Sequence, residues 1–206
     1  MRGAMSTAFA RCQLLGHNCV VTICTGGYDL MRSQTTLVVY RSKTGFTKKY
    51  AEWIAEELDA DLKHAADVST ETLLNYENIV YGGGLYAAGI NGIGLIKTNL
   101  PKLRSKKIAV FATGCTPPRQ ATTQEIMDKN FSASELQRLH FFYMRGGFDY
   151  SRLGLVDKIA MSLLKIKLKN KKHPTADDKG MLALYGHPVD FSSRRNIQPL
   201  VDYMRS

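Results

Sequence analysis

A short polar loop has the composition of an anion-binding turn. It reads Ser42-Lys43-Thr44-Gly45-Phe46-Thr47 and joins an apolar run to an amphipathic stretch. Free N–H groups and the positive end of the helix dipole make the start of a helix suitable for a phosphate, and glycine allows close backbone approach. Three hydroxyls would add hydrogen-bond donors, although serine and threonine at such a position also serve as plain N-caps. No GxxxxGK[ST] sequence occurs, so a P-loop nucleotide site lacks support.

Two later segments have the composition expected around a flat aromatic ligand. The first, 82–89, contains four glycines and Tyr86, whose ring could stack on a ligand or pack on a neighbouring helix at the rim. The second, 113–118, contains Gly114 and Cys115. Gly114 would leave backbone amides free to face a ligand. Cys115 has no second cysteine nearby, so we interpret it as a small loop residue in preference to a redox centre.

The elements that must position these loops alternate along the chain. Thr36 to Tyr40 form a β-branched run typical of a strand buried on both faces, and Tyr50, Ile54 and Leu58 then follow at helical spacing. Further strands are expected at 60–64, 78–82, 107–111 and 139–143, with helices at 69–75, 91–100, 119–129, 152–168 and 192–204. This alternation predicts a parallel sheet with right-handed crossovers and helices on both faces.

The loop at 42–47 matches in full the pattern [ST]-x-T-G-x-T, and on this basis residues 35–205 resemble the flavodoxin family. The resemblance implies a three-layer α/β sandwich whose five-stranded parallel sheet has the order 2-1-3-4-5, with FMN at its carboxyl edge. It implies that Ser42, Lys43, Thr44, Gly45, Phe46 and Thr47 hold the phosphate. The ring would be framed by Gly84, Leu85, Tyr86, Ala87, Ala88, Thr113, Gly114 and Cys115.

No catalytic side chain is predicted, because in such proteins the flavin carries out the redox chemistry. The protein positions the flavin and sets the electrostatic field around it. Amides near Gly114 would stabilise negative charge on the reduced ring. The histidines at 64, 140, 173 and 187 are scattered, so no metal site is predicted.

A basic amphipathic insertion is predicted at about 148–173. Six lysines and no acidic residue lie between Lys158 and Lys172, interleaved with Ile159, Leu163 and Ile166. Such a helix could lie on an anionic membrane or dock on a partner through about 152–172, or it could pack into the core with a solvated basic face. Residues 146–153 and 161–165 resemble the menaquinone-dependent protoporphyrinogen IX dehydrogenase branch of the family.

That branch implies electron transfer from a porphyrinogen to a quinone. The alternative is an electron carrier that docks on a redox partner through its lysines. A third alternative is nucleic-acid binding, which the net charge of +10, from 28 Lys and Arg against 18 Asp and Glu, would favour. We predict no such binding, because the lysines alternate with aliphatic residues and lack the interleaved aromatics that stack on bases.

The bulk composition predicts one domain over 34–206, preceded by an irregular appendage at 1–33. That appendage is either a functional extension or the product of a mistaken upstream start, with Met31 opening the domain. Its longest apolar run is too short for a signal peptide. The cysteines form no disulfide framework, and no apolar run is long enough to span a membrane. We therefore predict a cytoplasmic protein. The alternative is a peripheral position on the inner face of the membrane.

Overall fold

The computed structural model describes residues 8–12, 19–23, 35–86, 88–185 and 187–206. The chain divides into two units, Met1–Ser33 and Gln34–Ser206. In the first unit β1 (Ala8–Cys12) pairs antiparallel with β2 (Cys19–Ile23). The segment predicted to be irregular therefore contains this strand pair, and its other residues lie outside the described part of the chain.

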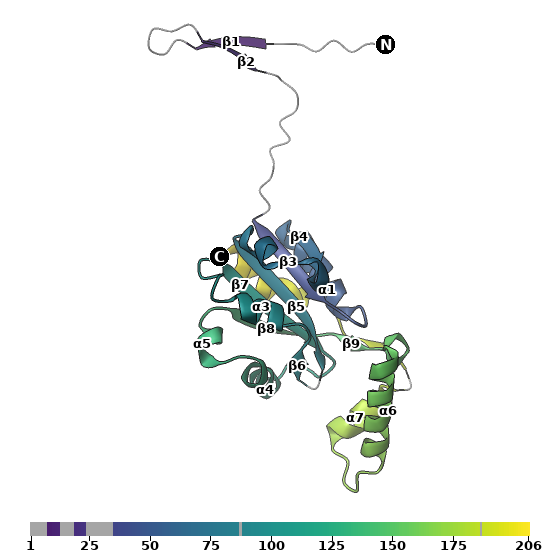
Figure 1. Cartoon of the computed structure of the whole chain (residues 1–206). Helices are drawn as coiled ribbons and strands as arrows, with labels where there is room; N and C mark the ends of the chain where they lie inside the picture. Colours follow the sequence, from purple (N-terminus) through teal and green to yellow (C-terminus); the bar gives the residue numbers. More distant parts are fainter. Residues whose placement is uncertain (1–7, 13–18, 24–34, 87, 186) are drawn as a thin grey trace, which may run out of the picture. The chain divides into compact units, whose positions relative to one another are not determined.

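A parallel sheet organises the second unit (Figure 1). Its strands are β3 (Thr36–Arg41), β4 (Asp61–His64), β5 (Asn78–Tyr86), β7 (Lys107–Gly114) and β8 (His140–Arg145). They lie in the order β4-β3-β5-β7-β8, which is 2-1-3-4-5 in order of appearance, so the predicted topology is confirmed. The short β6 (Gly89–Ile90) folds back antiparallel onto the end of β5.

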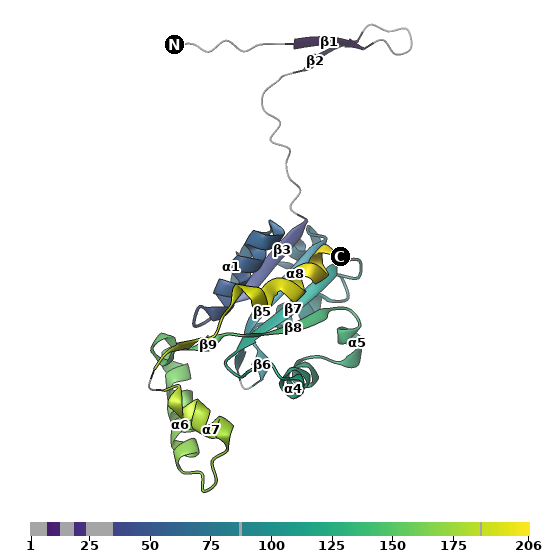
Figure 2. The same ribbon diagram turned by 180° about the vertical axis from the view of Figure 1, so that it is seen from behind.

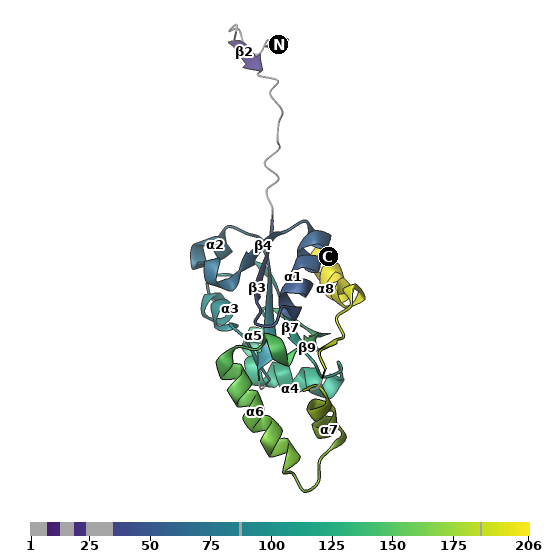
Figure 3. The same cartoon turned by 90° about the vertical axis from the view of Figure 1, so that its right-hand side faces the viewer.

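Helices cover both faces of the sheet (Figure 3). One face carries α1 (Phe46–Leu58) and α8 (Gln198–Arg205), and the other carries α2 (Thr70–Leu74) and α3 (Gly94–Asn99). Successive side chains of β3 point to opposite faces of the sheet, so both faces need a helical cover. Val38 packs with Ile54 and Leu200 on one face, and Leu37 packs with Leu73 on the other. The remaining elements of this part are η1 (Ala65–Asp67), α4 (Gln120–Asn130), α5 (Ala133–Leu136) and η3 (Arg194–Ile197).

Three strands, β5, β7 and β8, extend at least two residues further at their carboxyl ends than the sequence pattern predicts. The third was expected to end at 82 in a flexible glycine segment, but β5 continues to Tyr86, with Gly84 in register with Thr113 of β7. That expectation was wrong because these glycines serve strand packing. A Cβ at Gly82 would lie 2.1 Å from the ring of Phe111, so only glycine lets the ring cross the strand.

The predicted insertion leaves the sheet after β8. It contains β9 (Gly147–Phe148), η2 (Tyr150–Arg152), α6 (Leu155–Lys169), α7 (Ala176–Ala183) and β10 (Val189–Asp190). β9 and β10 pair antiparallel and form a neck, beyond which α6 and α7 project from the sheet (Figure 2). No side chain of α6 is buried, so the core-packing interpretation of this helix was wrong. Within the described residues, no helix combines the length and the apolar character needed to cross a bilayer.

Candidate cofactor site

The predicted phosphate loop lies between β3 and the first turn of α1. Gly45 occupies the N-cap position with φ of 95°, a left-handed conformation that favours glycine. Its N–H donates to Ser42 Oγ over 3.1 Å, and its carbonyl accepts the N–H of Lys49. The preceding N–H groups, those of Phe46, Thr47 and Lys48, have no acceptor one turn earlier in the helix. They give this turn the donor set that a phosphate requires.

The hydroxyls of the loop are in part engaged with the protein. Ser42 Oγ accepts the bond from Gly45, yet a hydroxyl that accepts can still donate its own proton. Thr47 is buried, and its Oγ1 lies 2.7 Å from Thr113 Oγ1 at the end of β7. One proton of that pair is used between the two oxygens, which leaves the other available. The loop thus combines fixed geometry with remaining donors.

All three predicted loops meet at the carboxyl edge of the sheet. A Cβ on Gly84 would lie 3.4 Å from Thr47 Oγ1, 3.7 Å from Tyr86 and 4.0 Å from Thr113 Oγ1. Gly84 therefore sits between the phosphate loop and the segment after β7. The parallel register of β3, β5 and β7 produces this meeting, because the carboxyl ends of parallel strands share one edge.

Asn130 of α4 fixes the turn that follows β5. Its side chain is buried, accepts the N–H of Ile90 at 2.8 Å and donates to the carbonyls of Ala88 and Ile126 at 2.7 Å. Ala88 adopts φ of 64°, unusual for a residue with a side chain, so the turn is held by its surroundings. Of the residues predicted to frame the ring, Ala87 lies outside the described residues.

Tyr86 lies at the edge of the site, with one face of its ring covered. The ammonium of Lys43 is 4.2 Å from the ring centre, a cation–π contact between two predicted site residues. Burial, followed by the nearby charge of Asp157, raises the pKa of Tyr86 to about 12. The phenol therefore stays neutral at physiological pH.

The segment after β7 is held by the end of the neighbouring strand β8. The carbonyl of Gly114 accepts the N–H of Gly146 at 2.8 Å, and Arg145 Nε donates to the carbonyl of Cys115 at 3.1 Å. Tyr143 donates to the carbonyl of Thr116 at 2.7 Å. Burial raises the pKa of the Cys115 thiol, with Arg145 opposing it, which favours the interpretation of a small, unreactive loop residue.

The insertion also reaches the phosphate loop, which the sequence analysis did not anticipate. Asp157 of α6 lies 2.8 Å from Lys43 Nζ, and Arg152 of η2 donates to the carbonyl of Thr44 at 3.4 Å. A Cβ on Gly45 would lie 3.3 Å from the same guanidinium. The sequence pattern predicts for the basic segment a membrane or partner surface, or a helix packed into the core, and the contacting residues lie more than 100 positions apart in sequence. No local pattern pointed to these contacts.

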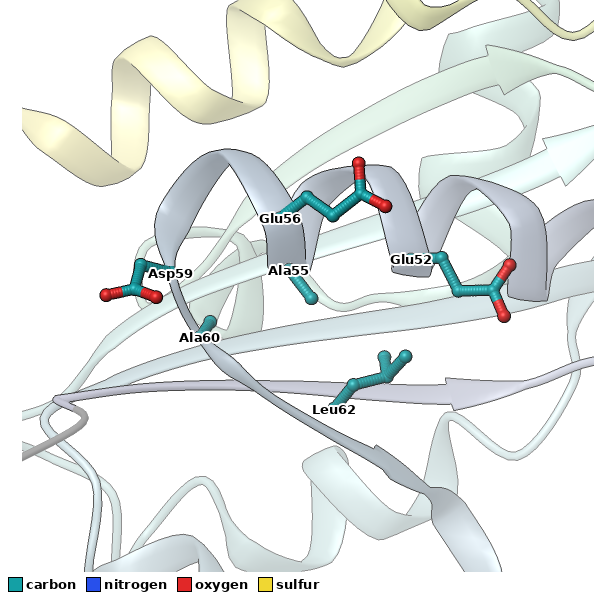
Figure 4. A pocket seen from close by; sticks show the side chains of 6 residues that line it. All are labelled: Glu52, Ala55, Glu56, Asp59, Ala60 and Leu62. Carbon is teal, nitrogen blue, oxygen red and sulfur yellow. The ribbon is translucent and has the colours of Figure 1, made fainter.

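A hollow of about 350 Å³ lies at the other end of α1 (Figure 4). Its lining includes the carboxylates of Glu52, Glu56 and Asp59, together with Ala55, Ala60 and Leu62. Negative side chains disfavour a phosphate, and none of the predicted site residues contributes to the lining. This hollow is separate from the candidate site.

The sheet order, the left-handed glycine and the three loops at the carboxyl edge define a flavodoxin-like protein. The model of the flavodoxin domain family matches residues 37–175, and the chain belongs to this family. Members of the family typically bind FMN.

Two curated proteins and one solved structure illustrate the similarity. The chain is 28% identical to an uncharacterised protein of Methanocaldococcus jannaschii over 145 residues, which cover 69% of this chain and 89% of that protein. It is 34% identical to a flavodoxin of Maridesulfovibrio salexigens over 93 residues, 38% of this chain and 62% of the other. The crystal structure of oxidised flavodoxin 2 from Bacillus cereus is 22% identical with a TM-score of 0.36, covering 53% of this chain and 84% of that one.

Proposed function

We propose that this chain is an FMN-dependent oxidoreductase of the protoporphyrinogen IX dehydrogenase type, with a quinone as electron acceptor. The observation that carries the proposal is the junction of the phosphate loop with the insertion, where Arg152 and Asp157 contact Thr44 and Lys43. Ordinary small flavodoxins lack this segment, whereas residues 146–153 and 161–165 resemble the dehydrogenase branch. The insertion is thus placed to influence the cofactor site.

The residues present fit FMN. The amides of the first turn of α1, with Ser42 and Thr44, would hold the phosphate, and Lys43 and Arg152 would offset its charge. Residues 84–88 and 113–115 would frame the ring. When bound, FMN supplies the redox chemistry: two electrons and two protons leave the porphyrinogen in each step and reduce the quinone to its quinol. The amides of Gly114 and Cys115 would favour negative charge on the reduced ring.

An absorbance spectrum of the purified protein tests the cofactor. We expect flavin bands that are lost in Gly45→Asp, because this substitution places a carboxylate at the phosphate and a side chain where φ is positive. Gly94→Asp is the matched control, since a Cβ there meets nothing within 4 Å. Flavin retained in Gly45→Asp would place the cofactor elsewhere.

Stopped-flow spectroscopy tests the reaction. Protein reduced by excess protoporphyrinogen should pass its electrons to a menaquinone analogue, and failure to do so removes the enzyme assignment while leaving FMN binding intact.

The second candidate function is that of an electron carrier that docks on an acidic redox partner. The exposed lysines of α6, together with the similarity to a protein named flavodoxin, favour it. The dependence of the electron-transfer rate on ionic strength distinguishes the two candidate functions. Electrostatically steered association with a partner slows steeply as salt is added, whereas turnover of a small substrate changes much less.

A further inference from the structure

The helix α6 carries a row of large apolar side chains that no part of the described chain covers. Relative exposures are 77% for Leu155, 79% for Val156, 57% for Ile159, 63% for Leu163 and 57% for Ile166. Leu155 and Val156 are adjacent and the others follow at intervals of three or four residues, so all five lie on one side of the helix. We call these five residues the apolar stripe. Contiguous exposed apolar surface of this kind marks an interaction site.

The opposite side of α6 has a partner. Tyr185, which follows α7, donates to the carbonyl of Met161 at 2.7 Å, and its ring lies 5.0 Å from Lys165 Nζ. Tyr150 of η2 lies 2.8 Å from Ser162 Oγ, at one edge of the apolar stripe and not on the opposite side. The helix is therefore fixed on one side and open on the other, and the apolar stripe is not simply the unpacked surface of a detached segment.

Lysines border the apolar stripe on both sides. At about 100° per residue, Lys158 and Lys169 fall on one border and Lys167 on the other. Two acidic residues at the ends of this region are already paired, Asp157 with Lys43 and Asp178 with Lys171, each within 2.8 Å. The open side of α6 thus presents aliphatic groups between two positive borders.

We propose that α6 binds in the plane of an anionic bilayer, with the apolar stripe among the lipid chains and the bordering lysines at the headgroups. Lysine suits this position, because its aliphatic stem lies along apolar surface while its ammonium reaches the phosphates. The 15 residues of α6 extend about 22 Å, less than the ~30 Å of a hydrocarbon core, which is consistent with a helix lying flat.

Other occupants satisfy fewer of these features. A second copy of the chain would bring lysine borders against lysine borders, and like charges repel. An acidic protein would need an apolar groove with carboxylates along both rims. A bilayer containing anionic lipid offers apolar chains directly beneath a layer of negative groups.

The contacts of Asp157 also set where the membrane would lie. Because Asp157 holds Lys43 of the phosphate loop, the first turn of α6 stands beside the candidate cofactor site. Binding through the apolar stripe would bring that site close to the membrane surface, where a lipid-dissolved electron acceptor is available. The membrane contact itself does not depend on the proposed function.

Sedimentation of the full chain with lipid vesicles tests the proposal. We expect binding to phosphatidylcholine vesicles containing about 30% phosphatidylglycerol to exceed binding to phosphatidylcholine alone by at least about tenfold. The double variant L163Q/I166Q should lose most of the binding. The triple variant K158Q/K167Q/K169Q should weaken it by roughly fivefold per lysine and reduce its sensitivity to salt.

Two control variants match these changes in chemistry and charge. L74Q removes a leucine of 41% exposure on α2, and K102Q/R104Q/R119Q removes three positive charges from exposed sites away from α6. Both should bind vesicles as the unaltered chain does.

The proposal is overturned if the unaltered chain stays in the supernatant with anionic vesicles at low salt, or if the controls lose as much binding as the α6 variants. It is also overturned if sedimentation velocity shows a dimer that L163Q/I166Q dissociates while vesicle binding is absent.

Discussion

The ammonium of Lys43 lies 2.8 Å from the carboxylate of Asp157 and 4.2 Å from the centre of the Tyr86 ring. One lysine therefore joins the phosphate loop, the inserted helix α6 and the end of β5. Asp157 places a negative charge beside Lys43, in the position where the phosphate loop would need that lysine for an anion. A phosphate bound at the loop would compete with this carboxylate for the same cation.

Replacing this carboxylate should strengthen FMN binding. In Asp157→Asn, Lys43 is free to face the phosphate and a like charge is removed, so we expect affinity to rise about fivefold, on the order of 1 kcal/mol for a partly exposed pair. Fluorescence titration of the apoprotein with FMN measures this. Asp178→Asn, which breaks the ion pair with Lys171, is the control. Unchanged or weaker FMN binding in Asp157→Asn would contradict the competition.

The buried pair of Thr47 and Thr113 should contribute to stability through its hydrogen bond. Thr113→Val leaves the Thr47 hydroxyl without its 2.7 Å partner, so we expect the free energy of unfolding to fall by about 1–2 kcal/mol. The double variant T47V/T113V should lose less than the sum of the two single variants, because no hydroxyl is then left unsatisfied. Urea unfolding of all four proteins gives the coupling energy. Strict additivity would show that the two hydroxyls do not interact.

Asn130 should stabilise both the fold and the turn at 88–90. Asn130→Ala removes the acceptor of the Ile90 N–H and the donor to Ala88, at a cost of about 1–3 kcal/mol for a buried polar group left unsatisfied. FMN affinity should also fall, since this turn belongs to the predicted ring-binding region. Thermal unfolding and FMN titration report the two effects. Asn170→Ala, at the exposed end of α6, should change neither.

The carboxyl of Asp178 should titrate well below its usual range. The hydrogen bond from Lys171, followed by that from the backbone of Thr175, lowers the pKa of Asp178 to about 2. A group whose pKa is lower in the folded state stabilises the fold above its unfolded pKa, and this contribution is lost as pH falls through the folded value. The stability of the α6–α7 pair should thus decline between about pH 4 and pH 2.

NMR titration of the Asp178 carboxyl carbon measures its pKa as the midpoint of the titration curve. Lys171→Gln should raise it, and a midpoint near 4 in the unaltered chain would contradict the observed pairing.

The sequence by itself determined the order of strands and helices, the parallel sheet and the loop at 42–47, because hydrophobic periodicity and turn residues are local properties of the chain. It also showed that α6 has an apolar side and a basic side. It could not show which side would be covered. Periodicity reveals that a stripe exists, while burial depends on what the rest of the chain packs against it, and here that is nothing among the described residues.

Only the tertiary structure decided which residues meet at the site. Thr47 and Thr113 are 66 positions apart, and Lys43 and Asp157 are 114 apart. The parallel alignment of β3, β5 and β7 brings the start of α1, which carries Thr47, to the end of β7, which carries Thr113. The β9–β10 neck directs α6 back to the phosphate loop for the second pair. Both contacts follow from the geometry of elements distant in sequence, which no local pattern of residues encodes.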